Sequence, residues 1–271
     1  YEAATADLND INMIDPYHLE AYGKAAVNYN RDIEVFPVLN AMFNMILGES
    51  PYKSPTDMGV NMAGFCIVND EACRRASLQE IIRRYYNIRC RFKQGEATES
   101  EVMKIDLIMK KAGLEETERR VVAPALKKAA ETGSPAAAIE LPSGKILTGK
   151  TSDLLGASAA LLLNSLKELA GIADDILLIS PVVIEPIQKL KVEHLGNENP
   201  RLHTDEVLLA LSICAATNPT AALALRQLKK LRGSEVHSSV ILSSVDMNTF
   251  KKLGINVTCE PVYQTKNLYH R

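Results

Sequence analysis

Cysteine patterns that signal disulfides or structural zinc are missing from this sequence. Its five cysteines are odd in number and widely spaced, and no two form a C-x-x-C pair. Such a set is typical of a reducing compartment with buried thiols, and it argues against a disulfide framework or a zinc site. We therefore expect a cytoplasmic protein without zinc.

Strong net charge and long apolar runs are missing as well. The formal net charge is −2, so composition gives no electrostatic reason to expect binding to nucleic acid or to an anionic membrane surface. No run approaches the roughly 18 apolar residues of a membrane-spanning helix. Residues 1–7 have neither the basic nor the apolar region of a signal peptide. The chain also begins without methionine, which predicts that it starts inside a longer protein.

Residues 1–132 read as mainly helical. Apolar residues recur at helical spacing over 18–48, where Pro37 predicts a kink or a break. Further helices are predicted over 77–92, 100–112 and 115–131, and residues 49–70 predict an ordered loop. The composition changes at residues 132–135, which places a domain boundary there.

Residues 133–271 predict a layered α/β domain with a mixed sheet. A hairpin of strands 136–141 and 145–148 leads into a helix over 153–170, capped by Ser152. A strand at 176–180 and helices over 184–195, 204–216 and 220–232 follow. Strand 236–242, helix 246–253 and strand 255–259 form a parallel βαβ unit.

This order of elements resembles the cytidine-deaminase-like scaffold, which also opens with a hairpin, a helix and parallel strands. The zinc enzymes of that scaffold need a His or Cys on the first helix and a C-x-x-C on the next. Residues 155–160 and 180–185 contain neither His nor Cys. The resemblance therefore concerns the fold and not the chemistry.

Residues 144–151, GKILTGKT, match the phosphate-loop pattern G-x-x-x-x-G-K-[ST]. The interior of the match is bulky and partly β-branched, which suits a strand better than a phosphate cradle. Pro142-Ser143-Gly144 is a tight-turn signature, and no aspartate ends strand 176–180 to hold Mg²⁺. We predict a hairpin, from which Lys150 and Thr151 could still bind an anion at a helix N-terminus.

Three polar stretches could bind a ligand. Residues 53–61 resemble either a functional loop or a capped surface turn. A basic helix could clamp a phosphate or carboxylate, or pair with Glu71 and Glu80. A stretch before the helix at 204 is a natural anion site, where a His–Asp pair could do acid/base work. The ligand-binding residues predicted in these stretches are Lys53, Ser54, Thr56, Asp57, Asn61, Arg83, Arg84, Arg201 and His203.

An acidic run near the amino terminus could hold a divalent metal through oxygen ligands. The alternative is an exposed turn followed by a helix that Asp15 caps before Pro16. The metal-binding residues predicted here are Asp7, Asp10, Asp15 and His18.

Five stretches carry a resemblance to a known family. They are residues 1–15 (YEAATADLNDINMID), 28–37 (NYNRDIEVFP), 54–64 (SPTDMGVNMAG), 79–86 (QEIIRRYY) and 199–221 (NPRLHTDEVLLALSICAATNPTA). They resemble an uncharacterised family of bacterial cytoplasmic proteins, known as a domain of unknown function. The resemblance implies that the chain is the carboxy-terminal half of a protein about twice as long. The absent half, as the family is known, carries a glycine-rich, phosphate-loop-like segment, and no activity is established.

Three functions are compatible with the sequence. The first is an enzyme acting on a nucleotide or another phosphorylated metabolite, its site shared between the absent half and residues 1–15 and 53–61, with Mg²⁺ and nucleotide only in the intact protein. The second is a homo-oligomerisation module built on the very apolar helices 153–170 and 204–232. The third is a metal-free, deaminase-like scaffold that binds a nucleoside.

Overall fold

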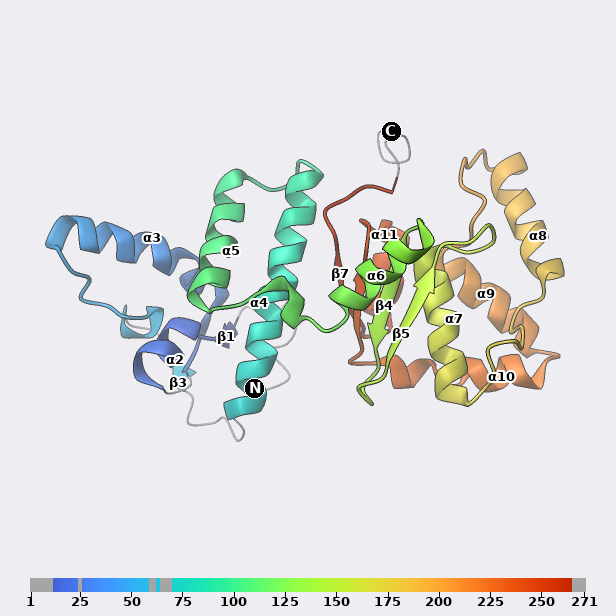
Figure 1. The fold of residues 1–271 in the computed structure, drawn as a ribbon, viewed down its shortest axis with the longest axis horizontal. Helices are drawn as coiled ribbons and strands as arrows, with labels where there is room; N and C mark the ends of the chain where they lie inside the picture. Colours follow the sequence, from blue (N-terminus) through green and yellow to red (C-terminus); the bar gives the residue numbers. More distant parts are fainter. Residues whose placement is uncertain (1–11, 24–25, 59–61, 64–69, 265–271) are drawn as a thin grey trace. The chain divides into compact units, whose positions relative to one another are not determined.

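The computed structural model describes residues 12–23, 26–58, 62–63 and 70–264. Its residues divide into two compact units, 1–119 and 120–271, and each unit is described by itself (Figure 1). No helix of the described residues combines the length and the apolar character needed to span a bilayer.

The first unit contains a small antiparallel sheet besides its helices. Its strands β1 (Asn12–Ile14), β2 (Ala26–Tyr29) and β3 (Met62–Ala63) lie in the order β1-β2-β3. The helices are α2 (Pro16–Tyr22), α3 (Asn30–Leu47), α4 (Asp70–Lys93) and α5 (Glu99–Lys111), with single 3₁₀ turns at Pro55–Met58 and Glu116–Glu118. The side chains of Ile33, Phe36, Ile82 and Ile105 are buried in its core.

The predicted helix over 18–48 is wrong in its middle. The chain leaves the helix at Gly23, whose φ of 63° is readily adopted by glycine and whose N–H bonds to the carbonyl of Leu19. Strand β2 follows, and Pro37 lies inside α3 rather than at a break. The strands of this unit are only two to four residues long, too short to leave an alternating pattern in the sequence.

The second unit is built on a four-stranded mixed sheet in the order β5-β4-β6-β7. Strand β4 (Ala136–Glu140) is antiparallel to β5 (Ile146–Lys150) and to β6 (Glu235–Ser238), and β6 is parallel to β7 (Asn256–Cys259). Helix α11 (Ser244–Lys252) connects the two parallel strands. The predicted α/β class, the hairpin and the βαβ unit are confirmed.

Helices cover both faces of this sheet. Four of the five residues of β4 are buried, and side chains alternate along a strand, so both faces of β4 are covered. Helix α6 (Val122–Thr132) packs with Ala125 against Ala138 on one face, and α7 (Ala157–Ala170) lies against β5 and β4 on the other. Because α6 packs against this sheet, it is part of the second unit. The boundary between the units therefore lies before α6, between residues 119 and 120, and not at the predicted 132/133.

The remaining helices lie between α7 and β6 in the sequence. They are α8 (Pro181–Lys189), which continues into a π-helical turn at Leu190–His194, α9 (Thr204–Ala215), α10 (Pro219–Leu225) and a 3₁₀ turn at Leu228–Leu231. The predicted strand at 176–180 is wrong. Ile176 and Leu177 are exposed, and Pro181 starts helix α8 only four residues after Leu177. Without that strand, the deaminase-like order of elements is not reproduced.

The phosphate-loop match forms the hairpin that its turn signature predicts. Gly144 closes the turn with a φ of 82°, and the rest of the match runs along β5. Gly149 faces α7 so closely that a Cβ atom there would lie 2.4 Å from the backbone nitrogen of Leu161. The second glycine of the motif therefore serves the packing of a helix on a strand.

Candidate functional site

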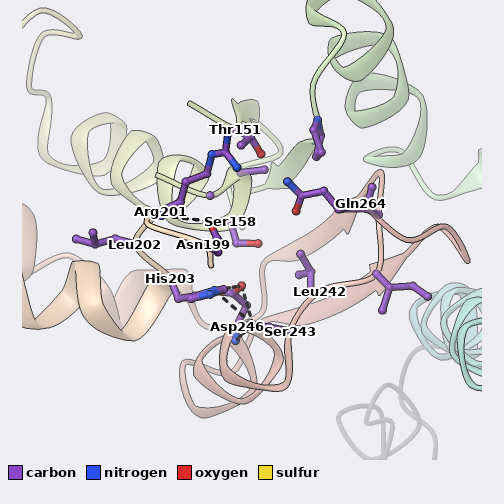
Figure 2. Close-up of a pocket in the computed structure, with 15 residues that line it drawn as sticks. Thr151, Ser158, Asn199, Arg201, Leu202, His203, Leu242, Ser243, Asp246 and Gln264 are labelled. Carbon is purple, nitrogen blue, oxygen red and sulfur yellow. Dashed lines mark hydrogen bonds and ion pairs between the residues drawn. The ribbon is translucent and has the colours of Figure 1, made fainter. Parts of the chain in front are cut away.

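Three helices of the second unit begin at one pocket (Figure 2). Their N-cap residues, Gly156 of α7, His203 of α9 and Ser243 of α11, all line this cavity of about 200 Å³. The backbone ties two of these starts together, because the N–H of Gly156 donates to the carbonyl of Leu202. Helix N-termini carry partial positive charge, so their convergence makes the pocket favourable for an anion.

His203 and Asp246 form a hydrogen-bonded pair on the pocket wall. The Nδ1 atom of His203 lies 3.0 Å from Oδ2 of Asp246, and Figure 2 shows the two side chains pointing toward one another. The His203 side chain is 31% exposed, whereas that of Asp246 is 8% exposed. A buried carboxylate thus orients a partly open imidazole.

Asp246 also receives three other hydrogen bonds. Thr204 donates both its N–H and its hydroxyl to Oδ1, each at 2.9 Å. Ser243 donates its hydroxyl to Oδ2 at 2.9 Å. With four donors around it, the carboxylate is held in its ionised form and has no further role as a base.

The pKa values of the pair move apart. The hydrogen bond to Asp246 raises the pKa of His203 above its ordinary 6.5, against the opposing effect of burial. Burial opposes ionisation of Asp246, but the hydrogen bonds from His203 and Thr204 outweigh it and lower the pKa of the carboxyl. The pair therefore favours a protonated His203 beside an ionised Asp246.

A second ion pair fixes the segment that carries His203. Lys191 donates at 2.7 Å both to the carbonyl of Arg201 and to Oε2 of Glu206. The same carboxylate oxygen accepts the backbone N–H of His203 at 2.8 Å. These contacts hold residues 201–203 at the pocket.

Arg201 and Thr151 lie on the opposite side of the pocket from Asp246. Nε of Arg201 donates to the carbonyl of Ser152 at 2.7 Å, which directs the guanidinium toward Thr151 (Figure 2). The two terminal amino groups of Arg201 make no hydrogen bond to the described part of the chain. The predicted residues Arg201, His203 and Thr151 are thus brought together.

The predicted helix start at Ser152 is wrong. Ser152 caps a turn, where its hydroxyl accepts the N–H groups of Leu154 and Leu155, and α7 begins only at Ala157. Lys150 is exposed on β5 and does not line the pocket. Two residues that do line it, Ser158 and Asp246, were not predicted.

The predicted loop and metal residues of the first unit bond to one another. Asp15 caps α2 by accepting the N–H of His18, and it also accepts the hydroxyl of Thr56 at 2.7 Å. His18 contacts Ser54, and Asp57 accepts the N–H groups of Lys53 and Ser54. Asp15 thus caps the helix as the alternative predicts, although it is buried and not exposed, and ligand or metal binding by these residues stays a prediction. Asp7, Asp10 and Asn61 lie outside the described residues.

Arg83 and Arg84 pair with a buried carboxylate. Glu80 is fully buried. Its Oε2 atom lies 2.9 Å from Nη2 of Arg83, and its Oε1 atom lies 2.5 Å from Nε of Arg84. Arg83 is itself only 1% exposed, so this ion pair is buried and not at the surface. Both arginines pair with Glu80, as the alternative predicts, and anion binding by them stays a prediction. Within the described ranges, no three His, Cys, Asp or Glu side chains are grouped to hold a metal ion.

The chain belongs to the DUF1846 family. A model described as the N-terminal domain of unknown function DUF1846 matches residues 1–113, and the corresponding C-terminal model matches residues 117–269. The predicted membership in an uncharacterised family is confirmed. The narrower expectation, that the residues form only the carboxy-terminal half, is not borne out, because the N-terminal model matches as well.

Curated relatives match along the whole chain. The UPF0371 protein str1377 of Streptococcus thermophilus (strain CNRZ 1066) is 58% identical over all 271 residues, which are 55% of its own length. UPF0371 proteins of Streptococcus pneumoniae (strain JJA) and Streptococcus pyogenes serotype M28 are 56% and 58% identical over the same shares. The chain thus spans about half the length of the relatives it matches, and their names state no activity.

Proposed function

We propose that the protein is an enzyme acting on a nucleotide or another phosphorylated metabolite, with His203 as its general acid and base. The observation that carries this proposal is the His203–Asp246 pair on the wall of a pocket where three helices begin. A proton-transfer group and a field that favours anions meet in one cavity. This site replaces the predicted one around residues 53–61.

The hydrogen bond to Asp246 defines what His203 does. Nδ1 donates its proton to Asp246, so the neutral imidazole presents the lone pair of Nε2. Nε2 takes a proton from a substrate hydroxyl or from water, and Asp246 stabilises the imidazolium that forms. Ser243 approaches the Nδ1 side at 3.5 Å and bonds to Asp246, so it is not placed as a nucleophile activated by Nε2. The arrangement favours direct proton transfer.

The proposal extends to the full-length protein. Because the chain spans 55% of the length of its relatives, we propose that further residues of such a protein contribute to the site and, if the substrate is a nucleotide, bind Mg²⁺ with it. The cytoplasmic location expected from the cysteine pattern stays a prediction.

A thermal-shift screen with nucleotides and phosphorylated metabolites, with and without Mg²⁺, tests the function. A ligand present at 100 times its Kd should stabilise the protein by about 2.7 kcal/mol. The ligands that raise Tm are then assayed for turnover. The proposal fails if no compound raises Tm at millimolar concentration.

A second function, self-assembly, rests on an exposed apolar face. Leu209 and Ile213 lie one helical turn apart on α9 and are 66% and 65% exposed. Large apolar side chains grouped at a surface mark interaction sites. We propose that this face binds a second copy of the chain.

Ile213→Glu should convert the assembly to a monomer in light scattering, because it would place a charge in the apolar contact. Lys252→Glu on α11 is the control, since Lys252 is exposed and lies outside this face. A native chain that is monomeric at high concentration contradicts self-assembly, as does an assembly that survives Ile213→Glu.

A further inference from the structure

The three helix N-termini at the pocket differ in how their N–H groups are satisfied. On α11, the N–H of Asp246 donates to the hydroxyl of Ser243, and on α9 the N–H of Thr204 donates to Asp246. The N-cap of α7 is Gly156, which offers no side-chain cap. The first N–H groups of a helix have no partner within it, and on α7 no side chain of the N-cap residue occupies any of them, so they can donate to a ligand.

Ser158 points independently to a ligand at this helix end. It is the second residue of α7 and is 2% exposed, yet its hydroxyl oxygen has no hydrogen-bond partner in the described structure. Figure 2 shows the hydroxyl directed into the pocket. A buried hydroxyl without a partner destabilises a fold. Its position is explained if a bound group accepts its hydrogen bond.

Charge and space around Ser158 suit an anion. Gly156 has no side chain to cover the helix end, and the atom nearest to a Cβ placed there is the carbonyl oxygen of Leu202 at 3.7 Å. Arg201 directs its terminal amino groups, which have no partner among the described residues, toward the same side of the pocket. The one carboxylate of the lining, Asp246, is already satisfied by its four donors.

We propose that the N-terminus of α7 binds the phosphoryl group of the substrate. The hydroxyl of Ser158 and the first N–H groups of α7 donate to the phosphoryl oxygens, and Arg201 supplies the countercharge. This subsite rests on the proposed function and narrows it. A cavity of about 200 Å³ is smaller than the roughly 300–1,000 Å³ of typical ligand pockets, so it favours a small phosphomonoester over a nucleotide. The reacting carbon or hydroxyl of that ester would lie toward His203.

Calorimetric titration of inorganic phosphate into the chain tests the subsite, with chloride at equal ionic strength as the blank. Ser158→Ala should weaken phosphate binding about tenfold, the effect of losing one hydrogen bond to a charged ligand. The same substitution should leave Tm of the phosphate-free protein unchanged or raise it, because it removes a buried hydroxyl without a partner. Lys150→Ala, a cation of the phosphate-loop match outside the pocket, should leave the Kd for phosphate unchanged.

Two results would overturn the subsite. One is an equal Kd for phosphate in the native chain and Ser158→Ala, and the other is a drop of several degrees in the phosphate-free Tm, which would make the hydroxyl structural. His203→Gln separates this proposal from the proposed function. If that variant keeps full turnover while phosphate binding still depends on Ser158, the acid/base function fails and the subsite stands. If turnover depends on His203 but phosphate binding does not depend on Ser158, the subsite fails alone.

Discussion

Replacing Gly149 with alanine is expected to destabilise the second unit by about 3 kcal/mol, because the new methyl group would overlap the backbone of α7. A Cβ atom at this position would lie 2.4 Å from the nitrogen and 2.7 Å from the Cα atom of Leu161. Backbone atoms in the middle of a packed helix cannot rotate away as a flexible side chain can. Strand β5 and α7 would have to separate, and thermal denaturation should show Tm lowered by roughly 6–12 °C.

Gly156→Ala is the matched control for this loss of stability. Its Cβ atom would meet only the carbonyl oxygen of Leu202, at an ordinary 3.7 Å, and Gly156 has a φ of −67°. Exchanging glycine for alanine at an N-cap is expected to lower stability by no more than about 1 kcal/mol. A Gly149→Ala protein with native Tm but weakened nucleotide binding would contradict the packing role and restore the phosphate-loop interpretation.

The sequence predicts the hairpin, but it does not show why residue 149 has to be glycine. Pro142, Ser143 and Gly144 specify a turn through their own backbone preferences, which act within a few residues and can be read directly. The need for glycine at 149 comes from Leu161, on another element, and depends on how closely α7 approaches β5. Such a constraint exists only after folding.

The failed strand at 176–180 has a related cause. An apolar run of four residues, Ile176–Ile179, is compatible with a strand or with a loop whose ends are buried. The structure buries Leu178 and Ile179 and exposes Ile176 and Leu177. This pattern differs from the alternation of buried and exposed residues along a half-buried strand. Pro181 then begins α8. Local composition alone could not separate these outcomes.

The sequence predicts some residues of the candidate site but not others. Arg201 and His203 stand before a helix start, and that local context marked them. The carboxylate that orients His203 comes from Asp246, 43 residues further along the chain, and the sequence offered no measure of that distance in space. The sequence does not mark Ser158 because it predicts a helix start at residue 153, which would place this residue inside the helix and not in its first turn at the pocket.

His203→Gln is expected to lower turnover of the substrate by about 10²–10⁴-fold, the usual contribution of a general acid or base. Glutamine keeps a polar side chain of similar length but cannot exchange a proton near neutral pH. His194 provides the control, because it is exposed on the π-helical turn and does not line the pocket. His194→Gln should keep native kcat/KM. Full turnover in His203→Gln would exclude the acid/base role.

Asp246→Asn tests whether the carboxylate acts through His203. The measurement is the dependence of kcat/KM on pH. An asparagine amide would donate to Nδ1, so the proton would move to Nε2 and the lone pair that accepts the substrate proton would be lost. In the native protein the general base is neutral His203, so kcat/KM should rise with pH through a pKa above 6.5. Without the carboxylate, the midpoint of any residual activity should shift to lower pH.

The His203–Asp246 pair should also affect the free energy of unfolding. The contribution of His203 to stability should fall as pH rises, whereas kcat/KM should rise. Because the folded state raises the pKa of His203, its stabilisation is fully present below 6.5 and disappears as pH rises through the folded-state value. The lowered pKa of Asp246 adds stabilisation above 3.8, which is lost as pH falls through the folded-state value. The difference in unfolding free energy between the native chain and Asp246→Asn should therefore be largest between about pH 4 and 6.5 and decline above the pKa of His203. A difference that stays constant from pH 5 to 9, together with an unshifted rate profile, would make Asp246 a cap of α9 without influence on His203.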